Sequence, residues 1–332
     1  MSGQRILDVR DLTKHFPIKK GFFQKTVGHV KAVDGVSFFL NKGESIGLVG
    51  ESGCGKSTAA RAIMRLVEPT SGSIVFQDQD ICTLSHCDLR KVRKSIQIIF
   101  QDPYSSLNPR QNIGAIVGEP MDIYKTWKTR QERRDRIAYL LEKVGLKSDH
   151  ADRYPHEFSG GQRQRICVAR ALALNPMCVI GDEPVSALDV SVQAQIINLM
   201  EDLQKEFDLS YIIISHDLAV VEHMCDRIMV MYLGRIVESA RDVDIIKNPV
   251  HPYTRALLSA VLEPDPDHVT ARQVLKGDVP SPSNPPPGCH FHTRCPECEA
   301  VCRREKPETI HLGNGHYVAC HRVAASRSPG SA

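Results

Sequence analysis

The chain has 332 residues, of which 42% are hydrophobic and 24% charged, and this composition excludes a disordered chain. Its formal net charge of +3 is too small to indicate a nucleic-acid partner by itself. No window holds about 18 consecutive apolar residues, so we expect no membrane span, and the N-terminal segment carries no pattern of a secretory signal.

Short apolar runs rich in β-branched residues alternate along the chain with segments of helical periodicity. Five runs predict strands buried on both faces: 45–50, 73–76, 96–100, 177–182 and 211–215. Residues 191–207 place their apolar side chains on one stripe of a helix. This alternation predicts an α/β fold with a mainly parallel sheet.

Three further segments have patterns of their own. Residues 104–160 lack strand patterns and predict a helical insertion, in which Gly145 is a candidate helix C-cap. Residues 227–239 predict a hairpin that turns around Tyr232–Gly234. Prolines accumulate from Glu263 onward and predict an irregular module rather than a core element. We therefore expect a main domain, a C-terminal module and a disordered end at 1–262, 263–325 and 326–332.

A phosphate-binding motif follows the first of the five predicted strands. GESGCGKST matches the pattern G-x-x-x-x-G-K-[ST] between a strand and a helix. Its glycines let backbone N–H groups point at phosphate oxygens, Lys56 brings positive charge to the β- and γ-phosphates, and Ser57 offers a hydroxyl to Mg²⁺. The expected nucleotide contacts are Gly50, Ser52, Gly53, Cys54, Gly55, Lys56, Ser57 and Thr58.

A pair of acidic residues completes this site in the sequence. The predicted strand CVIGD delivers Asp182 to its carboxyl end, where the carboxylate can hold Mg²⁺ directly or through water. Glu183 follows at once, in a place from which a carboxylate can polarise an attacking water. Together with the phosphate-binding motif, this pair predicts a nucleoside triphosphatase.

The segment FSGGQRQRICVARAL, Phe158–Leu172, resembles the signature motif of ABC-transporter ATPases. Ser159, Gly160 and Gly161 open a helix whose amides form a second anion site, which Gln162 completes. The resemblance implies a RecA-like P-loop core with a helical subdomain and an antiparallel β subdomain. It also implies that two such domains pack head to tail, so that the signature of one closes over the γ-phosphate bound by the other.

The remaining motifs of that family occur in the family's order. The resemblance assigns Gln101 in IIFQDP as the glutamine that senses Mg²⁺ and water, and His216 in IIISHD as the switch histidine that contacts the γ-phosphate. SALD, which ends at Asp189, matches the loop that crosses the dimer interface. Phe16 occupies the position of the aromatic ring that stacks on adenine. The implied catalytic residues are Glu183, His216 and Gln101, and the implied Mg²⁺ ligands are Ser57, Gln101 and Asp182.

The chain is most similar to the ATP-binding subunits of bacterial dipeptide and oligopeptide importers. The segments NPVHPYTRALLSA and SPSNPPPGCHFHTRCP are typical of that group, and QDPYSSLNPR favours the dipeptide-type second subunit of the heterodimeric pair. The resemblance implies an ATPase that drives peptide uptake from the cytoplasmic face of the inner membrane. Its implied partners are two transmembrane permeases, a paralogous ATPase subunit and an extracytoplasmic solute-binding protein, with no nucleic acid.

A second hypothesis is a soluble ABC protein that acts on ribosomes or nucleic acid without a membrane partner. Such proteins usually carry two ATPase cassettes, long coiled-coil insertions or basic stripes. The sequence shows none of these features, so the importer is the preferred interpretation.

Five of the eleven cysteines lie after residue 288. An ATPase without a secretory signal works in a reducing compartment, which argues against disulfides. Cys295-Pro-Glu-Cys298 has the spacing of a zinc knuckle, with histidines nearby. Four thiolates can also hold a [4Fe–4S] cluster, but the spacing differs from the tight runs of ferredoxins. The pattern alone therefore favours zinc over iron–sulfur.

The resemblance reverses that order. Peptide-importer ATPases carry a C-terminal module of the form G-C-x-F-x-x-R-C-P followed by two further cysteines, and some members hold a [4Fe–4S] cluster. The resemblance thus implies a structural cluster, with zinc and an absence of metal as alternatives. Its ligands would be Cys289, Cys295, Cys302 and Cys320, with Cys298 as a possible substitute.

Overall fold

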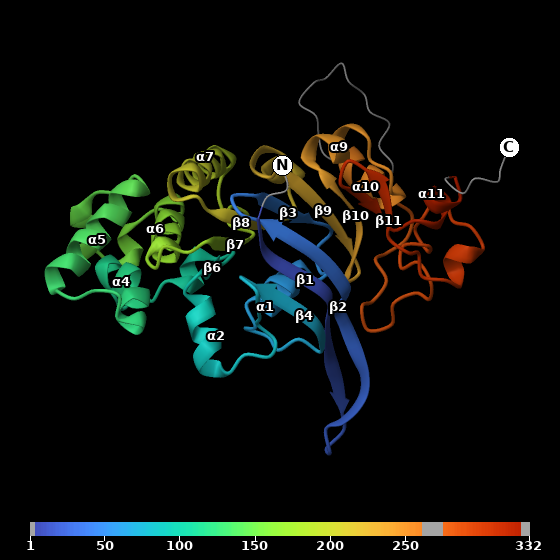
Figure 1. The fold of residues 1–332 in the computed structure, drawn as a ribbon, viewed down its shortest axis with the longest axis horizontal. Coiled ribbons are helices and arrows are strands. Elements are labelled where there is room, and N and C mark those ends of the chain that lie inside the picture. The colour runs from blue at the N-terminus through green and yellow to red at the C-terminus, as the bar shows by residue number, and fades with distance from the viewer. Residues whose placement is uncertain (1–3, 261–274, 327–332) are drawn as a thin grey trace. The chain divides into compact units, whose positions relative to one another are not determined.

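The computed structural model describes residues 4–260 and 275–326 (Figure 1). The chain forms two compact units. The first unit comprises 1–7, 40–45 and 76–215, and the second comprises 8–39, 46–75 and 216–332. The expected boundary at 262/263 and nearly all of the expected disordered end at 326–332 lie outside the described residues.

Three parallel strands form the centre of the first unit. They are β6 (Ile96–Ile99), β7 (Cys178–Asp182) and β8 (Ser210–Ser215). Cys178 pairs with Ile96 on one side and with Ser210 on the other. Every residue of β7 and β8 is buried, as expected of a strand covered on both faces. The predicted strands at 96–100, 177–182 and 211–215 are confirmed to within one residue.

Helices and one two-residue strand make up the other elements of the first unit. The insertion expected at 104–160 is helical, as predicted, and Gly145 follows α5 with a φ of +74°, as a helix C-cap glycine does. After β7 the chain forms α7, which matches the helix predicted at 191–207. The elements are β5 (Gln79–Asp80), α2 (His86–Arg93), α3 (Pro103–Ser106), α4 (Ile113–Tyr124), α5 (Arg130–Lys143), η1 (Ser148–Asp152), η2 (Pro155–Glu157), α6 (Gly160–Leu172) and α7 (Val190–Phe207).

A mixed sheet and a long ribbon form most of the second unit. Strand β3 (Ser45–Val49) pairs in parallel with β9 (Arg227–Tyr232), and β9 turns at Leu233–Gly234 into the antiparallel strand β10 (Arg235–Arg241). This confirms the predicted hairpin. In Figure 1, β1 (Arg5–Lys20) and β2 (Lys25–Asn41) run beside each other as a ribbon. Strand β4 (Ser71–Phe76) lies next to β1.

Four helices of the second unit connect or cover these strands. Helix α1 (Lys56–Ile63) follows β3, and α8 (Leu218–Met224) precedes β9. Helices α9 (Asp242–Lys247) and α10 (Pro252–Ser259) follow β10. A Cβ on Gly47 of β3 would lie 1.9 Å from Val221 Cγ1 of α8, so this strand must carry glycine to pack against the helix.

The C-terminal segment departs from the expectation of an irregular module outside the core. Strand β12 (His316–Val318) pairs with β10 through Glu238↔Val318, and β11 (Ile310–Gly313) pairs with β12. These strands use the hydrogen-bonding groups that β10 would expose as an edge strand. Residues 275–309 do lack strands, and η3 (Val301–Arg303) and α11 (His321–Ala325) are short. None of the described helices is long and apolar enough to cross a bilayer.

Candidate nucleotide site and C-terminal cysteines

The loop between β3 and α1 has the backbone shape that its glycines predict. Gly55 has a φ of +111°, and a Cβ there would lie 1.9 Å from the carbonyl oxygen of Ala32. A Cβ on Gly50 would lie 2.2 Å from the carbonyl oxygen of Met231. Lys56 opens α1, is 5% exposed, and donates from Nζ to the carbonyl oxygen of Gly50 at 2.7 Å. The loop and its lysine therefore form one compact structure at the N-terminus of a helix, where anions are favoured.

The acidic pair stands at the carboxyl end of β7. Asp182 ends the strand and is 1% exposed. Glu183 has a φ of +52°, which is rare for a residue with a side chain, and its N–H donates to the carbonyl oxygen of Ile214. The Gln101 side-chain amide donates to Glu183 Oε2 at 2.8 Å. The strained backbone of Glu183 and this hydrogen bond bring the side chains of two residues predicted to be catalytic into contact.

The signature segment begins helix α6 as predicted. Ser159 is the N-cap: its hydroxyl accepts from the Gln162 N–H, and Gln162 Oε1 accepts from the Ser159 N–H at 3.1 Å. A Cβ on Gly161 would lie 2.4 Å from Val192 Cγ1 of α7. Glycine is therefore required for α6 to pack this closely, and Ser159 remains exposed at the start of the helix. Asp189 is also exposed, as the N-cap of α7.

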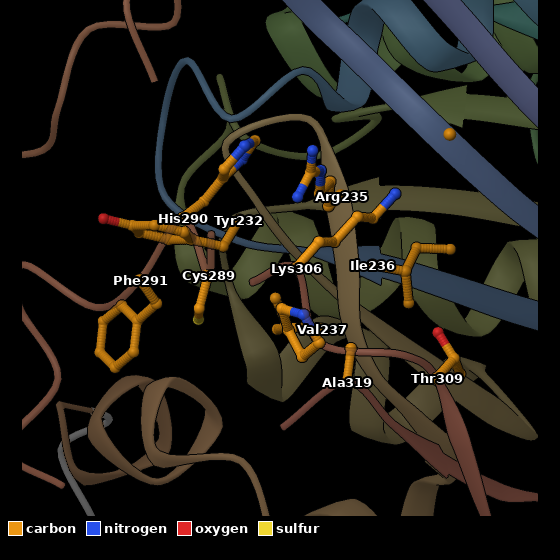
Figure 2. Close-up of a pocket in the computed structure, with 12 residues that line it drawn as sticks. Tyr232, Arg235, Ile236, Val237, Cys289, His290, Phe291, Lys306, Thr309 and Ala319 are labelled. Atoms are coloured by element: carbon orange, nitrogen blue, oxygen red, sulfur yellow. The ribbon is translucent and has the colours of Figure 1, made fainter. Parts of the chain in front are cut away.

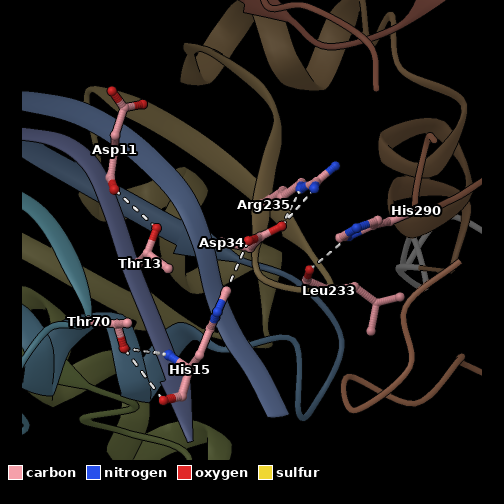
Figure 3. Close-up of polar contacts among 8 residues, drawn as sticks. All are labelled: Asp11, Thr13, His15, Asp34, Thr70, Leu233, Arg235 and His290. Carbon is pink, nitrogen blue, oxygen red and sulfur yellow. Dashed lines mark hydrogen bonds and ion pairs between the residues drawn. The ribbon is translucent and has the colours of Figure 1, made fainter. Parts of the chain in front are cut away.

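Phe16 lies on β1 with 37% of its surface exposed. The Lys14 ammonium is 4.9 Å from the centroid of its ring. The neighbouring His15 contacts Asp34 at 3.1 Å, and Asp34 also accepts two hydrogen bonds from Arg235 (Figure 3). Burial is the largest single effect and raises the pKa of Asp34. The hydrogen bonds and charge of Arg235, the hydrogen bond from His15 and the charge of Lys31 together lower this pKa overall. The network fixes the strand while Phe16 presents its ring to solvent.

The predicted site residues are divided between the two units. The glycine-rich loop, Phe16 and His216 belong to the second unit, and His216 is exposed directly after β8. Gln101, Asp182, Glu183 and the signature helix belong to the first unit.

Three residues beside the loop carry no functional pattern in the sequence: Glu51, Tyr253 and Arg294. Arg294 makes an ion pair with Glu51 at 2.7 Å, and the Tyr253 hydroxyl accepts from the Glu51 N–H. Both contacts span more than 200 residues of sequence. Glu51 stands at a variable position of its motif, so the loop pattern drew no attention to it.

The C-terminal cysteines are close enough to influence one another. The pKa of the Cys289 thiol is raised to about 11, mainly by burial and in smaller part by the neighbouring Cys302, Cys320 and Cys298. Burial likewise raises the pKa of Cys295 to about 12. Figure 2 shows Cys289 lining a small cavity with His290 and Tyr232. All five are free cysteines, with no disulfide between them. Burial raises the pKa of the Cys302 thiol as well.

The metal site expected in this segment is not formed in the structure. Across residues 4–260 and 275–326, no three or more His, Cys, Asp or Glu side chains are arranged to hold a metal ion. Metals bind thiolates rather than thiols, and Cys298 Sγ points to the carbonyl oxygen of Glu299. The described structure therefore does not bring the expected ligands together as a metal site: Cys289, Cys295, Cys302 and Cys320, with Cys298 as a possible substitute.

Comparisons with known proteins agree with the motifs. A family model described as ABC transporter matches residues 33–186, and one described as the C-terminal region of oligopeptide/dipeptide transporters matches 237–302. The chain is 56% identical to the oligopeptide transport ATP-binding protein AppF of Bacillus subtilis, over 96% of this chain and 97% of that protein. It is 51% identical to the dipeptide transport ATP-binding protein DppF of Escherichia coli, over 98% and 97%.

Solved structures show the same fold. A dimeric ATP-binding cassette, MJ0796, bound to ADP and Pi, has a TM-score of 0.63 and 28% identity, over 71% of this chain and 98% of that chain. The cassette cbiO1 of Clostridium perfringens has the same TM-score and identity, over 74% and 92%. The predicted α/β fold of a P-loop ABC ATPase is thereby confirmed.

Proposed function

Because the chain belongs to the ATP-binding subunits of oligopeptide and dipeptide ABC transporters, we propose that the residues described above carry out its ATPase cycle. The protein is an ABC ATPase that hydrolyses ATP to power peptide uptake. The single observation that carries the residue assignment is the contact between Gln101 and Glu183 at the end of β7. This hydrogen bond joins the glutamine and the glutamate that the family motifs identify, and the backbone of the glutamate is in a strained, left-handed conformation.

ATP binding is assigned to the glycine-rich loop and to three other elements. The loop amides, Lys56 and Thr58 hold the phosphates, and Phe16 stacks on adenine with its exposed ring. The signature residues and Asp189 belong to the composite site of a second ATPase domain. The exposed position of Ser159 and Asp189 supports this assignment, since both must remain available to a partner.

Mg²⁺ is assigned to oxygen donors. The hydroxyl of Ser57, the amide of Gln101 and the carboxylate of Asp182 are the hard ligands that this ion prefers, and Asp182 is a buried acid at a strand end. The ion would neutralise charge on the β- and γ-phosphates. Glu183 then orients and polarises the attacking water, with Gln101 holding its carboxylate and His216 contacting the γ-phosphate.

ABC importer ATPases work with transmembrane permeases and as ATPase dimers. We assign a paralogous ATPase subunit as the dimer partner, a solute-binding protein beyond the permeases, and a position on the cytoplasmic face of the inner membrane. The high identity to DppF over nearly the whole chain supports this finer assignment. The relatives named above are peptide-transport proteins, so the ribosome or nucleic-acid hypothesis has no support.

The test is Glu183→Gln in the assembled transporter, with the partner's composite site separately disabled. ATP binding should persist while turnover falls by orders of magnitude, because only the group that activates water is lost. Glu142→Gln, at an exposed glutamate of α5, is the matched control and should leave turnover unchanged. Turnover near normal in Glu183→Gln would sink the role assigned to this residue.

The metal content of the C-terminal segment is a separate proposal. We propose that 263–325 form a module whose structural [4Fe–4S] cluster is held by Cys289, Cys295, Cys302 and Cys320, with Cys298 as a possible substitute and zinc as the alternative metal. The proximity of Cys302, Cys320 and Cys298 to Cys289 supports this proposal. Because the thiols as placed form no ligand group, no step of the ATPase cycle is assigned to a cluster. Anaerobic purification followed by iron, sulfide and zinc analysis should find about four iron atoms per chain, the content of one [4Fe–4S] cluster. Zinc without iron would contradict the proposal.

A further inference from the structure

The backbone N–H, the carbonyl oxygen and the carboxylate of Glu51 all form hydrogen bonds. Its carboxylate receives two hydrogen bonds from Arg294, at 2.7 Å from Nη1 and 3.1 Å from Nη2. Its N–H donates to the Tyr253 hydroxyl at 3.0 Å, and its carbonyl oxygen accepts from Lys56 Nζ at 3.2 Å. Glu51 is the second residue of the phosphate-binding loop. The same residue therefore connects the C-terminal segment with the lysine that binds phosphate.

The ion pair between Arg294 and Glu51 is largely removed from water. The Arg294 side chain is 8% exposed and the Glu51 side chain 29%. Two parallel hydrogen bonds fix the direction of the carboxylate as well as its distance. Glu51 raises the pKa of Arg294, so the guanidinium stays charged. Loss of one partner would leave the other charge buried and uncompensated, which is strongly unfavourable.

Aromatic packing holds Arg294 in place. Tyr232, Tyr253 and Phe291 form a buried cluster in which the ring centroids are 4.7 to 5.4 Å apart. Phe291 stands three residues before Arg294, and Figure 2 shows it near Tyr232. The Arg294 guanidinium lies 5.9 Å from the centroid of the Tyr232 ring. Since the cluster joins β9, α10 and the C-terminal segment, Arg294 is presented to the loop from a rigid support.

We propose that Arg294 is a positioning residue for ATP binding: it holds Glu51, and through Glu51 the phosphate-binding loop and Lys56, in the conformation that receives the phosphates. The C-terminal segment thereby acts directly on the nucleotide site. This inference rests on the proposed assignment of the loop as the ATP site.

The experiment measures kcat, KM for ATP and the Kd for ATP in the assembled transporter. Arg294→Ala should raise KM and Kd by about tenfold to a hundredfold, the range expected for loss of a charged hydrogen bond, while kcat changes much less. Arg294→Lys keeps the positive charge but loses the planar pair of donors. Its KM and Kd for ATP should lie between those of the unchanged protein and those of Arg294→Ala. If Arg294→Ala does not fold, the Arg294→Lys result decides, and an unchanged KM there overturns the proposal.

A matched control comes from the same segment. Arg322 makes an ion pair with Glu297 at 2.9 Å, and its side chain is 57% exposed. Arg322→Ala should leave KM unchanged. Glu51→Ala alone and combined with Arg294→Ala completes a double-mutant cycle. A double variant no worse than either single one supports the direct pair, and fully additive effects overturn it.

Failure of the inference differs from failure of the proposed function. Lys56→Ala should abolish ATP binding, and binding that persisted would overturn the site assignment and the inference together. If Lys56→Ala abolishes binding while Arg294→Ala resembles Arg322→Ala, only the inference falls. A fall in kcat and thermal stability with KM unchanged would assign Arg294 a merely structural role and also overturn it.

Discussion

Gln101 and Glu183 illustrate how single residues create the reactive geometry. Glu183 occupies a left-handed backbone conformation that costs about 1–3 kcal/mol for a residue with a side chain. Its N–H bonds to Ile214, and Ser186 Oγ donates to its carbonyl oxygen. These bonds hold the strained residue, and the Gln101 amide then fixes the carboxylate.

At this scale we predict that Gln101→Glu lowers ATP turnover by about tenfold or more. A second carboxylate 2.8 Å from Glu183 Oε2 would replace a donor by a like charge and raise the pKa of one of the two acids. Steady-state ATPase assays check this. Gln97→Glu is the control, since Gln97 on β6 donates to the carbonyl oxygen of Arg93 at the end of α2 and not to Glu183. Equal activity of the two variants would contradict the prediction.

At the scale of elements, the start of α6 serves both stability and function. Ser159 and Gln162 cap each other's backbone N–H groups, so these two donors at the start of the helix have partners. The N–H groups of Gly160 and Gly161 are not part of this cap. Helix α4 has a comparable cap, in which Asn112 Oδ1 accepts from the Ala115 N–H at 2.8 Å. Only the cap of α6 lies in the signature motif.

This comparison predicts a separation of stability from activity. Ser159→Ala and Asn112→Ala should each lower the free energy of unfolding by about 1 kcal/mol, the usual cost of a lost N-cap. Only Ser159→Ala should also reduce ATP turnover in the assembled complex. Denaturant titration and ATPase assays measure the two effects. Normal turnover in Ser159→Ala, or an equal loss in Asn112→Ala, would contradict a functional role for this cap.

At the scale of the whole molecule, two buried histidines make stability depend on pH. Burial lowers the pKa of His251 and of His290 to about 4, against the attraction of Glu238 for the first and of Asp34 for the second. Arg255 near His251, and Arg235 and Lys31 near His290, lower these values further. His290 also contacts the carbonyl oxygen of Leu233 (Figure 3).

We therefore predict that the second unit loses stability as pH falls from about 6.5 to about 4. In this window the unfolded chain binds protons at both histidines and the folded chain does not, so acid favours unfolding. The lowered pKa of Glu238 acts in the same direction. Thermal unfolding at several pH values measures the effect, and His290→Gln should weaken it. A Tm independent of pH would contradict the prediction.

Much of the core could be predicted from the sequence because its signals are local. The apolar runs of β7 and β8 cover whole strands. The glycines of the loop indicate directly that its backbone adopts positive φ angles and lies close to other backbone atoms. The start of α6 is likewise indicated in the sequence by Ser159, a residue type that favours the helix N-cap. The pairing of β12 with β10 carried no such signal, because a three-residue strand is too short to show periodicity.

By itself, the sequence determined the fold class, the family and the identity of the phosphate-binding, acidic and signature motifs, since each is written in consecutive residues. Only the tertiary structure decided that Arg294 reaches Glu51 across 243 positions and that β12 extends the sheet beyond β10. It also decided that the C-terminal cysteines lie near one another without forming a ligand group within the described residues. These contacts depend on how distant segments pack, because burial and pairing partners are properties of the folded chain.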